Sequence, residues 1–104
     1  MSIYHLISRQ GFDAQADSDF ILDDANLAAG FVHCCTADQL PGVIARYFPG
    51  DNSTLLVVEL NPEILTEGLK WEEATDSDGL FPHIYGPINR SAIIDVRPYG
   101  CKSG

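Results

Sequence analysis

Three histidines, at positions 5, 33 and 83, are the residues of this sequence best suited to acid–base chemistry or ligand binding. His5 lies in "IYHLIS" and His33 lies in "GFVHCCT", and both alternate with apolar residues. Because burying an imidazole without partners is costly, two such positions in 104 residues predict a polar cleft between strands. A core histidine bonded to one backbone carbonyl is the alternative interpretation of each.

The adjacent cysteines Cys34 and Cys35 raise two further kinds of site beside His33. A zinc site needs three or four ligands, and the chain has no C-x-x-C or H-x-x-x-H spacing, so we expect no bound metal. A cysteine nucleophile paired with His33 is the other possibility. On a strand only Cys35 shares the face of His33, and this spacing is not a signature of such a pair. An odd count of three cysteines, the third being Cys101, argues against a disulfide scaffold.

A carboxylate and an aromatic segment follow later in the chain. Glu72 lies on the polar face of "LKWEEA", on the other side of that strand from Trp71. The segment "FPHIYG" brings His83 and Tyr85 into a proline-bounded loop, and such loops often carry function. The alternatives are a solvated carboxylate and a rigid turn that packs Phe81 and Tyr85 into the core.

The elements that must position these side chains are mostly short strands. Strand patterns occur at residues 3–8, 31–35, 54–60, 69–74 and 91–99. Residues 54–60 are apolar on both faces, which predicts a central strand. Residues 80–88 contain two prolines and a glycine, so we expect mostly an ordered turn with extended character there.

Two helices are predicted between these strands. A short helix covers residues 8–17, with Ser8 as its N-cap. The main helix follows Thr36 and Gln39, which form a T-x-x-Q capping box, and runs to about residue 48. Pro41 conflicts with this start, because it removes an early helical hydrogen bond unless the helix begins there. One main helix among short strands, without regular βαβ alternation, favours the α+β class.

Length and charge restrict the partners. The 104 residues suit a single domain, residues 1–104. A net charge of −9 argues against binding free nucleic acid or an anionic membrane. There is no apolar run of about 18 residues and no secretory signal, so we expect a cytoplasmic protein. Arg9 and Arg90 are the candidates for a local phosphate contact.

The order of five motifs resembles a bacterial family called "domain of unknown function 952": "IYHLIS", "GFVHCCT", "LLVVEL", "KWEEA" and "LFPHIYGPI". The resemblance covers about residues 3–98. Because this family is similar in fold to the ADP-ribosyltransferases, the resemblance implies two small, mostly antiparallel sheets, one main helix and a short N-terminal helix. It also implies a cleft that binds nicotinamide dinucleotide in the enzymes of that fold, which makes NAD the candidate cofactor.

The same resemblance implies roles for single residues. His5 matches a first-strand histidine that contacts the adenosine ribose in histidine-type transferases, and His33 matches a second histidine on the nicotinamide side. The pair also resembles the RNA 2′-phosphotransferase branch, which removes a phosphate through ADP-ribosyl chemistry. Glu72 is the candidate catalytic carboxylate by analogy. The expected ligand contacts are His5, Arg9, His33, His83 and Tyr85.

The leading hypothesis is therefore a cleft for a small nucleotide-type ligand, with ADP-ribosyl or 2′-phosphate transfer by His5, His33 and Glu72. The carboxylate would orient a ribose hydroxyl or the nucleophile. The rival hypothesis is a non-catalytic binding or interaction module that keeps the fold without the chemistry. A cleft without a catalytic carboxylate would favour the rival.

Overall fold

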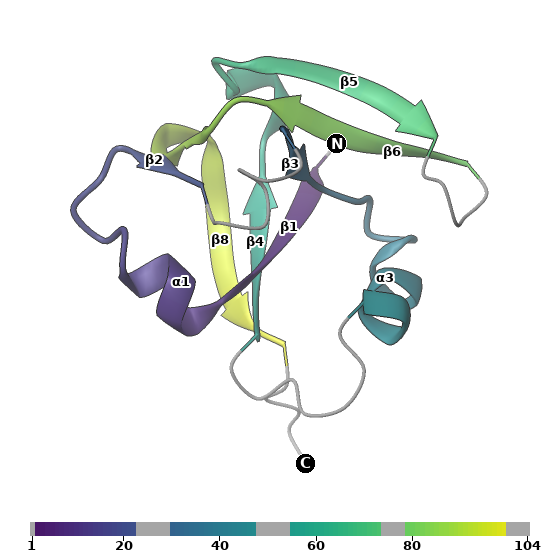
Figure 1. The fold of residues 1–104 in the computed structure, drawn as a ribbon, viewed down its shortest axis with the longest axis horizontal. Helices are drawn as coiled ribbons and strands as arrows, with labels where there is room; N and C mark the ends of the chain where they lie inside the picture. The colour runs from purple at the N-terminus through teal and green to yellow at the C-terminus, as the bar shows by residue number, and fades with distance from the viewer. Residues whose placement is uncertain (1, 23–29, 48–54, 74–78, 100–104) are drawn as a thin grey trace.

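A computed structural model describes residues 2–22, 30–47, 55–73 and 79–99, and the strands within these ranges form three antiparallel sheets (Figure 1). The first sheet has the order β1 (Ile3–Ser8), β4 (Leu55–Leu60), β8 (Ile93–Pro98). The second has the order β3 (Val32–His33), β6 (Leu80–Tyr85), β5 (Gly68–Glu73). The third pairs β2 (Phe20–Ile21) with β7 (Ile88–Asn89).

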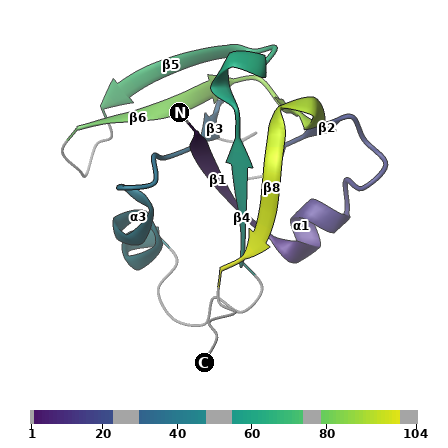
Figure 2. The same ribbon diagram turned by 180° about the vertical axis from the view of Figure 1, so that it is seen from behind.

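Helical segments connect these strands: α1 (Arg9–Asp13), α3 (Leu40–Tyr47), and the 3-10 turns η1 (Pro62–Ile64) and η2 (Arg90–Ala92). Figures 1 and 2 show α1 and α3 on opposite sides of the first sheet, with the second sheet across one end of it. The predicted α+β class with mostly antiparallel sheets is confirmed, and the small β2–β7 sheet is an addition to the prediction. Within the described ranges, no helix has the length and apolar character needed to cross a membrane.

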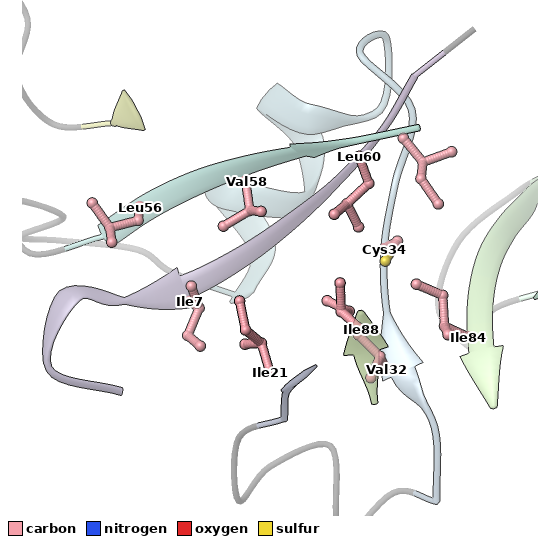
Figure 3. Close-up of a cluster of buried hydrophobic side chains, with 10 residues drawn as sticks. Ile7, Ile21, Val32, Cys34, Leu56, Val58, Leu60, Ile84 and Ile88 are labelled. Carbon is pink, nitrogen blue, oxygen red and sulfur yellow. The ribbon is translucent and has the colours of Figure 1, made fainter. Parts of the chain in front are cut away.

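The main core lies where the sheets face one another (Figure 3). It contains Ile3, Ile7, Ile21, Val32, Cys34, Leu56, Val58, Leu60, Ile84 and Ile88. Burying each Ile, Leu or Val side chain stabilises the fold by about 1.5–3 kcal/mol. The core therefore fixes the second sheet by one face and leaves its other face for polar and aromatic side chains.

A second apolar cluster explains why residues 54–60 are apolar on both faces. Leu55 and Val57 of β4 point away from the main core and pack with Leu6 and Ile44. Ile44 belongs to α3, so this helix covers the first sheet on its other side. The predicted central strand is confirmed, because β4 lies between β1 and β8.

The capping box at the start of α3 is confirmed. The backbone N–H of Thr36 donates to Oε1 of Gln39 at 2.9 Å, and the N–H of Gln39 donates to Oγ1 of Thr36 at 3.3 Å. Pro41 lies in the first turn, where a missing N–H costs no hydrogen bond within the helix. The predicted end near residue 48 lies just outside the described residues.

The expectation that residues 80–88 are mostly a turn is wrong, although the extended character expected there is confirmed. Residues Leu80–Tyr85 form β6, the central strand of the second sheet, although they contain Pro82. The carbonyl of Pro82 accepts from the N–H of Cys34 at 3.1 Å, so the proline nitrogen faces the end of β3 as well. The missing N–H therefore leaves the ladder between β6 and β5 intact.

The same proline shortens β3 relative to the predicted strand 31–35. At the Cys34 position only one of the two ladder bonds can form, so β3 ends at His33. Cys35 then exchanges two backbone hydrogen bonds with Tyr4 of β1, at 2.7 and 2.8 Å. The segment thus connects the second sheet to the first.

The short N-terminal helix is confirmed, but it ends earlier than predicted. Oγ of Ser8 accepts from the N–H of Gly11 at 3.0 Å, and α1 ends at Asp13 rather than residue 17. The following turn is held by Arg90, whose guanidinium donates to the carbonyls of Gln15 and Ser18 at 2.6 and 2.8 Å. Arg90 thereby joins the turn after β7 to the segment before β2.

Candidate functional site

The outer face of the second sheet collects the polar residues of three strands. Lys70 pairs with His83, and His83 pairs with His33, so these three side chains form one row across the sheet. Glu72 and Tyr85 lie two positions from this row on the same face. The buried Val32 and Ile84 alternate with them and point into the core.

Four rings on this face are linked by contacts, and we name Phe31, His33, His83 and Tyr85 the aromatic–histidine cluster. Phe31 stacks on His83 with 4.2 Å between centroids and 25° between planes. Phe31 also lies 4.6 Å from His33 and 5.3 Å from Tyr85, and the two histidine rings are 5.6 Å apart. Phe31 therefore covers much of His83, whereas Tyr85 is 40% exposed.

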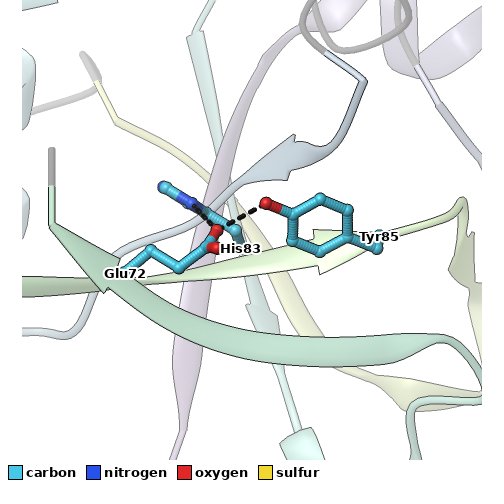
Figure 4. Close-up of polar contacts among 3 residues, drawn as sticks. All are labelled: Glu72, His83 and Tyr85. Carbon is cyan, nitrogen blue, oxygen red and sulfur yellow. Dashed lines mark hydrogen bonds and ion pairs between the residues drawn. The ribbon is translucent and has the colours of Figure 1, made fainter.

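Glu72 closes the cluster from the neighbouring strand (Figure 4). Its Oε1 accepts from the hydroxyl of Tyr85 at 2.5 Å and lies 2.9 Å from Nδ1 of His83. The hydrogen bond from Tyr85, followed by that from His83, lowers the pKa of Glu72 below its ordinary value. The same bond raises the pKa of Tyr85. At neutral pH the cluster thus contains the neutral phenol of Tyr85, and the ionised carboxylate of Glu72 lies beside it.

The ionised carboxylate also sets the protonation of the His83 ring. A carboxylate without a proton can only accept, so Nδ1 of His83 carries the proton in this hydrogen bond. The other nitrogen, Nε2, is then the ring nitrogen that does not bond to Glu72. This is the arrangement by which a carboxylate orients a histidine for general acid–base work.

His5 has a different environment from His33. His5 is buried on the core face of β1, and its Nδ1 lies 2.7 Å from the backbone carbonyl of His33. The side chain of His33 is exposed and contacts the rings of Phe31 and His83. His5 therefore matches the interpretation as a core histidine bonded to a carbonyl, and it supports β3 from inside.

The two arginines expected near a phosphate lie elsewhere. Arg9 is exposed at the start of α1, five residues along the chain from Tyr4, whose backbone pairs with Cys35. Because five residues of extended chain span roughly 16 Å, Arg9 lies at the other end of β1 from the point where Tyr4 pairs with Cys35. Arg90 is engaged with two backbone carbonyls and lies over the ring of Phe12. The basic group at the cluster is instead Lys70, whose Nζ lies 5.2 Å from the centroid of Tyr85.

Cys34 and Cys35 are free and buried, and Cys101 lies outside the described residues. Burial raises the pKa of the Cys34 thiol well above its ordinary value, and Cys35 adds to this effect. Burial also raises the pKa of Cys35 to about 12. Both thiols are therefore protonated at neutral pH, which argues against a cysteine nucleophile. Among the described residues, no group of three or more His, Cys, Asp or Glu side chains is arranged to hold a metal.

Phe31 and Lys70 are members of the site that the sequence interpretation did not single out. Alternation could have indicated both, because each stands two positions from a candidate: Phe31 from His33, and Lys70 from Glu72. Alternation could not indicate that Phe31 stacks on His83, because the two residues are 52 positions apart in the sequence.

The family described as "Protein of unknown function (DUF952)" matches residues 7–96. The chain belongs to this family. The matched range contains His33, Glu72, His83 and Tyr85, and it begins two residues after His5. The DUF952 family identity thus agrees with the motifs noted in the sequence.

Solved structures of a protein from Caulobacter crescentus are similar to this DUF952 chain. The crystal structure of protein CC0527 has a TM-score of 0.86 and 28% sequence identity, covering 99% of this chain and 90% of that one. The solution NMR structure of CC0527 has a TM-score of 0.79 and 29% identity, covering 98% and 87%. No curated protein matches the sequence.

Proposed function

We propose that this protein binds a small nucleotide-type ligand on the aromatic–histidine cluster, and that its fold is ADP-ribosyltransferase-like. The observation that carries the proposal is the stack of Phe31 on His83 at 4.2 Å, with the exposed ring of Tyr85 beside it and the carboxylate of Glu72 at its edge. A flat apolar surface next to a charged acceptor suits a ligand that joins a planar ring to a hydroxylated sugar.

Each part of such a ligand has a partner in this cluster. The planar ring stacks on Tyr85 and Phe31, an interaction worth about 1–3 kcal/mol per base. Ribose hydroxyls donate to the carboxylate of Glu72, whose two described hydrogen bonds both use Oε1. A phosphate is met by Lys70, the exposed cation on the same face, in place of the arginines expected from the sequence.

The proposed reaction is transfer of an ADP-ribosyl group or of a 2′-phosphate. In ADP-ribosyl transfer from NAD, the bond between ribose C1′ and the nicotinamide nitrogen breaks, and its electron pair leaves with nicotinamide. The acceptor forms the new bond to C1′, and its proton passes to Nε2 of His83. Glu72 orients the ribose and offsets the positive charge that develops on it. His33 contacts the ligand, and His5 positions the His33 backbone.

The second candidate is a binding module without catalysis. The observation that favours it is that Glu72 holds both Tyr85 and His83 through a single oxygen. A carboxylate with this internal role stabilises the cluster whether or not a reaction takes place there. Release of nicotinamide from NAD separates the two candidates, because a pure binding module leaves NAD intact.

Thermal shift assays with NAD, ADP-ribose and a ribose-2′-phosphate nucleotide test the binding itself. A ligand at one hundred times its Kd stabilises the fold by about 2.7 kcal/mol. For a domain of this size the melting temperature then rises by roughly ten degrees or more. If none of the three ligands raises the melting temperature at millimolar concentration, the proposed binding is wrong.

A pair of phenylalanine variants locates the site. Phe31→Ala removes the stacked ring, and we expect the affinity to fall by about 1–3 kcal/mol. Phe20→Ala is the matched control, because Phe20 is an exposed phenylalanine on β2, in a different sheet. Equal affinities of the two variants would keep the ligand but remove it from this face.

A further inference from the structure

The position of Lys70 over Tyr85 carries information about the ligand. The ammonium nitrogen lies 5.2 Å from the centroid of the ring, which is the geometry of a cation–π contact. The register explains how the contact arises: Tyr85 faces Gly68, and its ring extends past Lys70 so that its hydroxyl reaches Glu72. The tyrosine ring thus has a positive charge on its face and a negative charge at its hydroxyl.

We propose that the aromatic–histidine cluster prefers a ligand whose stacking ring is positively charged, and that the ammonium of Lys70 occupies the place of this ring over Tyr85. The inference rests on the proposed function, because it concerns the same surface and the same class of ligand. It adds the charge of the recognised group: an N-alkylated aromatic cation binds better than its neutral counterpart.

The electrostatics of the surface support this preference. The carboxylate of Glu72 is next to Tyr85, and its lowered pKa keeps it charged at neutral pH. The whole chain carries a net charge of −9, so its long-range field attracts cations. The faces of Phe31 and Tyr85 add the negative potential of aromatic rings. A neutral ring gains the stacking but not these charge interactions.

Lys70 is suited to be displaced by such a ligand. Its side chain is exposed on a flexible stem, and a surface ammonium is easily rehydrated when it moves aside. Once the ligand ring takes its place over Tyr85, the ammonium is available to a phosphate of the same ligand. Lys70 therefore opposes the binding of a cationic ring that has no phosphate, and it supports the binding of a ligand that has one.

Two small probes test the charge preference without a phosphate: the cation 1-methylnicotinamide and neutral nicotinamide. Binding is followed by NMR chemical-shift titration of the Tyr85 and His83 signals. We expect the cation to bind about two- to fivefold more tightly, as a cation–π contact at an exposed site provides. Glu72→Gln should reduce this preference. Equal affinity for the two probes overturns the inference. Absence of binding by either probe at about 20 mM also overturns it.

Removal of the Lys70 ammonium tests directly whether it occupies the place of the ligand ring over Tyr85. Lys70→Ala should raise the affinity for 1-methylnicotinamide by about two- to fivefold and lower the affinity for ADP-ribose. Arg97→Ala is the matched control, because Arg97 is an exposed cation on β8 and its loss changes the net charge equally. Lys70→Gln repeats the test if the alanine variant unfolds. A lower affinity of both lysine variants for the cation contradicts the inference.

ADP-ribose distinguishes the failure of this inference from failure of the proposed function, because it has the ribose and phosphates but no nicotinamide. Binding of ADP-ribose together with equal affinities for the two probes rejects the cation preference and keeps the nucleotide site. Absence of binding by ADP-ribose, NAD and both probes rejects the two together.

Discussion

The Glu72 carboxylate connects two strands of the second sheet through one oxygen atom. Oε1 accepts from Tyr85 and from His83, both on β6, while Glu72 itself lies on β5. These bonds favour the ionised form and lower the pKa of Glu72. At the scale of single residues, this network decides which groups of the cluster carry charge, and it is therefore the place where pH acts on the protein.

The pH dependence of stability should report on this network. In the folded chain the pKa of Glu72 lies below its ordinary value of 4.5, so its hydrogen bonds stabilise the fold above that pH. This contribution is lost as the pH falls through the lower, folded-state value. Tyr85→Phe removes the largest cause of the shift. We expect the variant to melt below the wild type at neutral pH and to approach it as the pH falls below 4.5 and Glu72 gains a proton.

Thermal melts of the wild type, Tyr85→Phe and Tyr99→Phe across this pH range are the measurement. Tyr99 is a suitable control, because it is as exposed as Tyr85, at 42% against 40%. The raised pKa of Tyr85 does not interfere, since its phenol is neutral below pH 10.0 in either state. A difference between wild type and Tyr85→Phe that stays constant with pH would contradict the role given to Glu72.

At the scale of elements, Pro82 determines how the second sheet ends. The proline allows a complete ladder between β6 and β5, but it prevents the second bond between β6 and β3 at Cys34. Cys35 then pairs with Tyr4 of the other sheet. The missing N–H therefore sets the point where the chain leaves one sheet for the other.

Pro82→Val should lengthen β3 by restoring that N–H. We expect the new amide to donate to the carbonyl of Cys34, a bond worth about 0.5–1.5 kcal/mol. Valine leaves the unfolded chain more flexible than proline does, which lowers the free energy of unfolding by about 0.4–1 kcal/mol. The two effects offset each other, so the net stability should change little. Hydrogen exchange by NMR is the measurement. An amide at position 82 that exchanges as fast as an exposed loop amide would show that β3 has not been extended.

At the scale of the whole molecule, the core between the sheets holds the candidate site in place from behind. Ile84 of β6 and Val32 of β3 are fully buried, and they alternate with the residues of the aromatic–histidine cluster. The position of His83 and His33 therefore depends on the packing of their neighbours on the other face.

Ile84→Ala should be strongly destabilising, with a loss of about 2–5 kcal/mol in the free energy of unfolding, because it leaves a cavity in the core. Ile94→Ala is the control: Ile94 is 55% exposed on β8, and we expect a change of no more than about 0.5 kcal/mol. Urea denaturation of both variants measures the difference. Equal stabilities would show that the sheets do not depend on this core.

Much of the fold follows from local patterns in the sequence. The alternation of Ile3, His5 and Ile7 predicts β1, and the apolar run from Leu55 to Leu60 predicts the central β4. Thr36 and Gln39 fix the start of α3 through a local capping box. These predictions succeed because periodicity and capping depend on neighbours only a few residues apart. The polar face of β5, with Lys70 and Glu72, follows in the same way.

Only the tertiary structure decided where Pro82 stands in the sheet and which side chains form the site. The sequence favours an ordered turn with extended character at residues 80–88, because prolines are rare in central strands. A proline is accepted there only where the sheet needs no N–H donor from it. Glu72, Tyr85 and His83 meet because β5 and β6 pair in one register, and Phe31 covers His83 because β3 pairs on the other side. His5 and His33 look alike in sequence, but sheet pairing buries one ring and exposes the other. Contacts between distant segments depend on register and packing, which no local pattern contains.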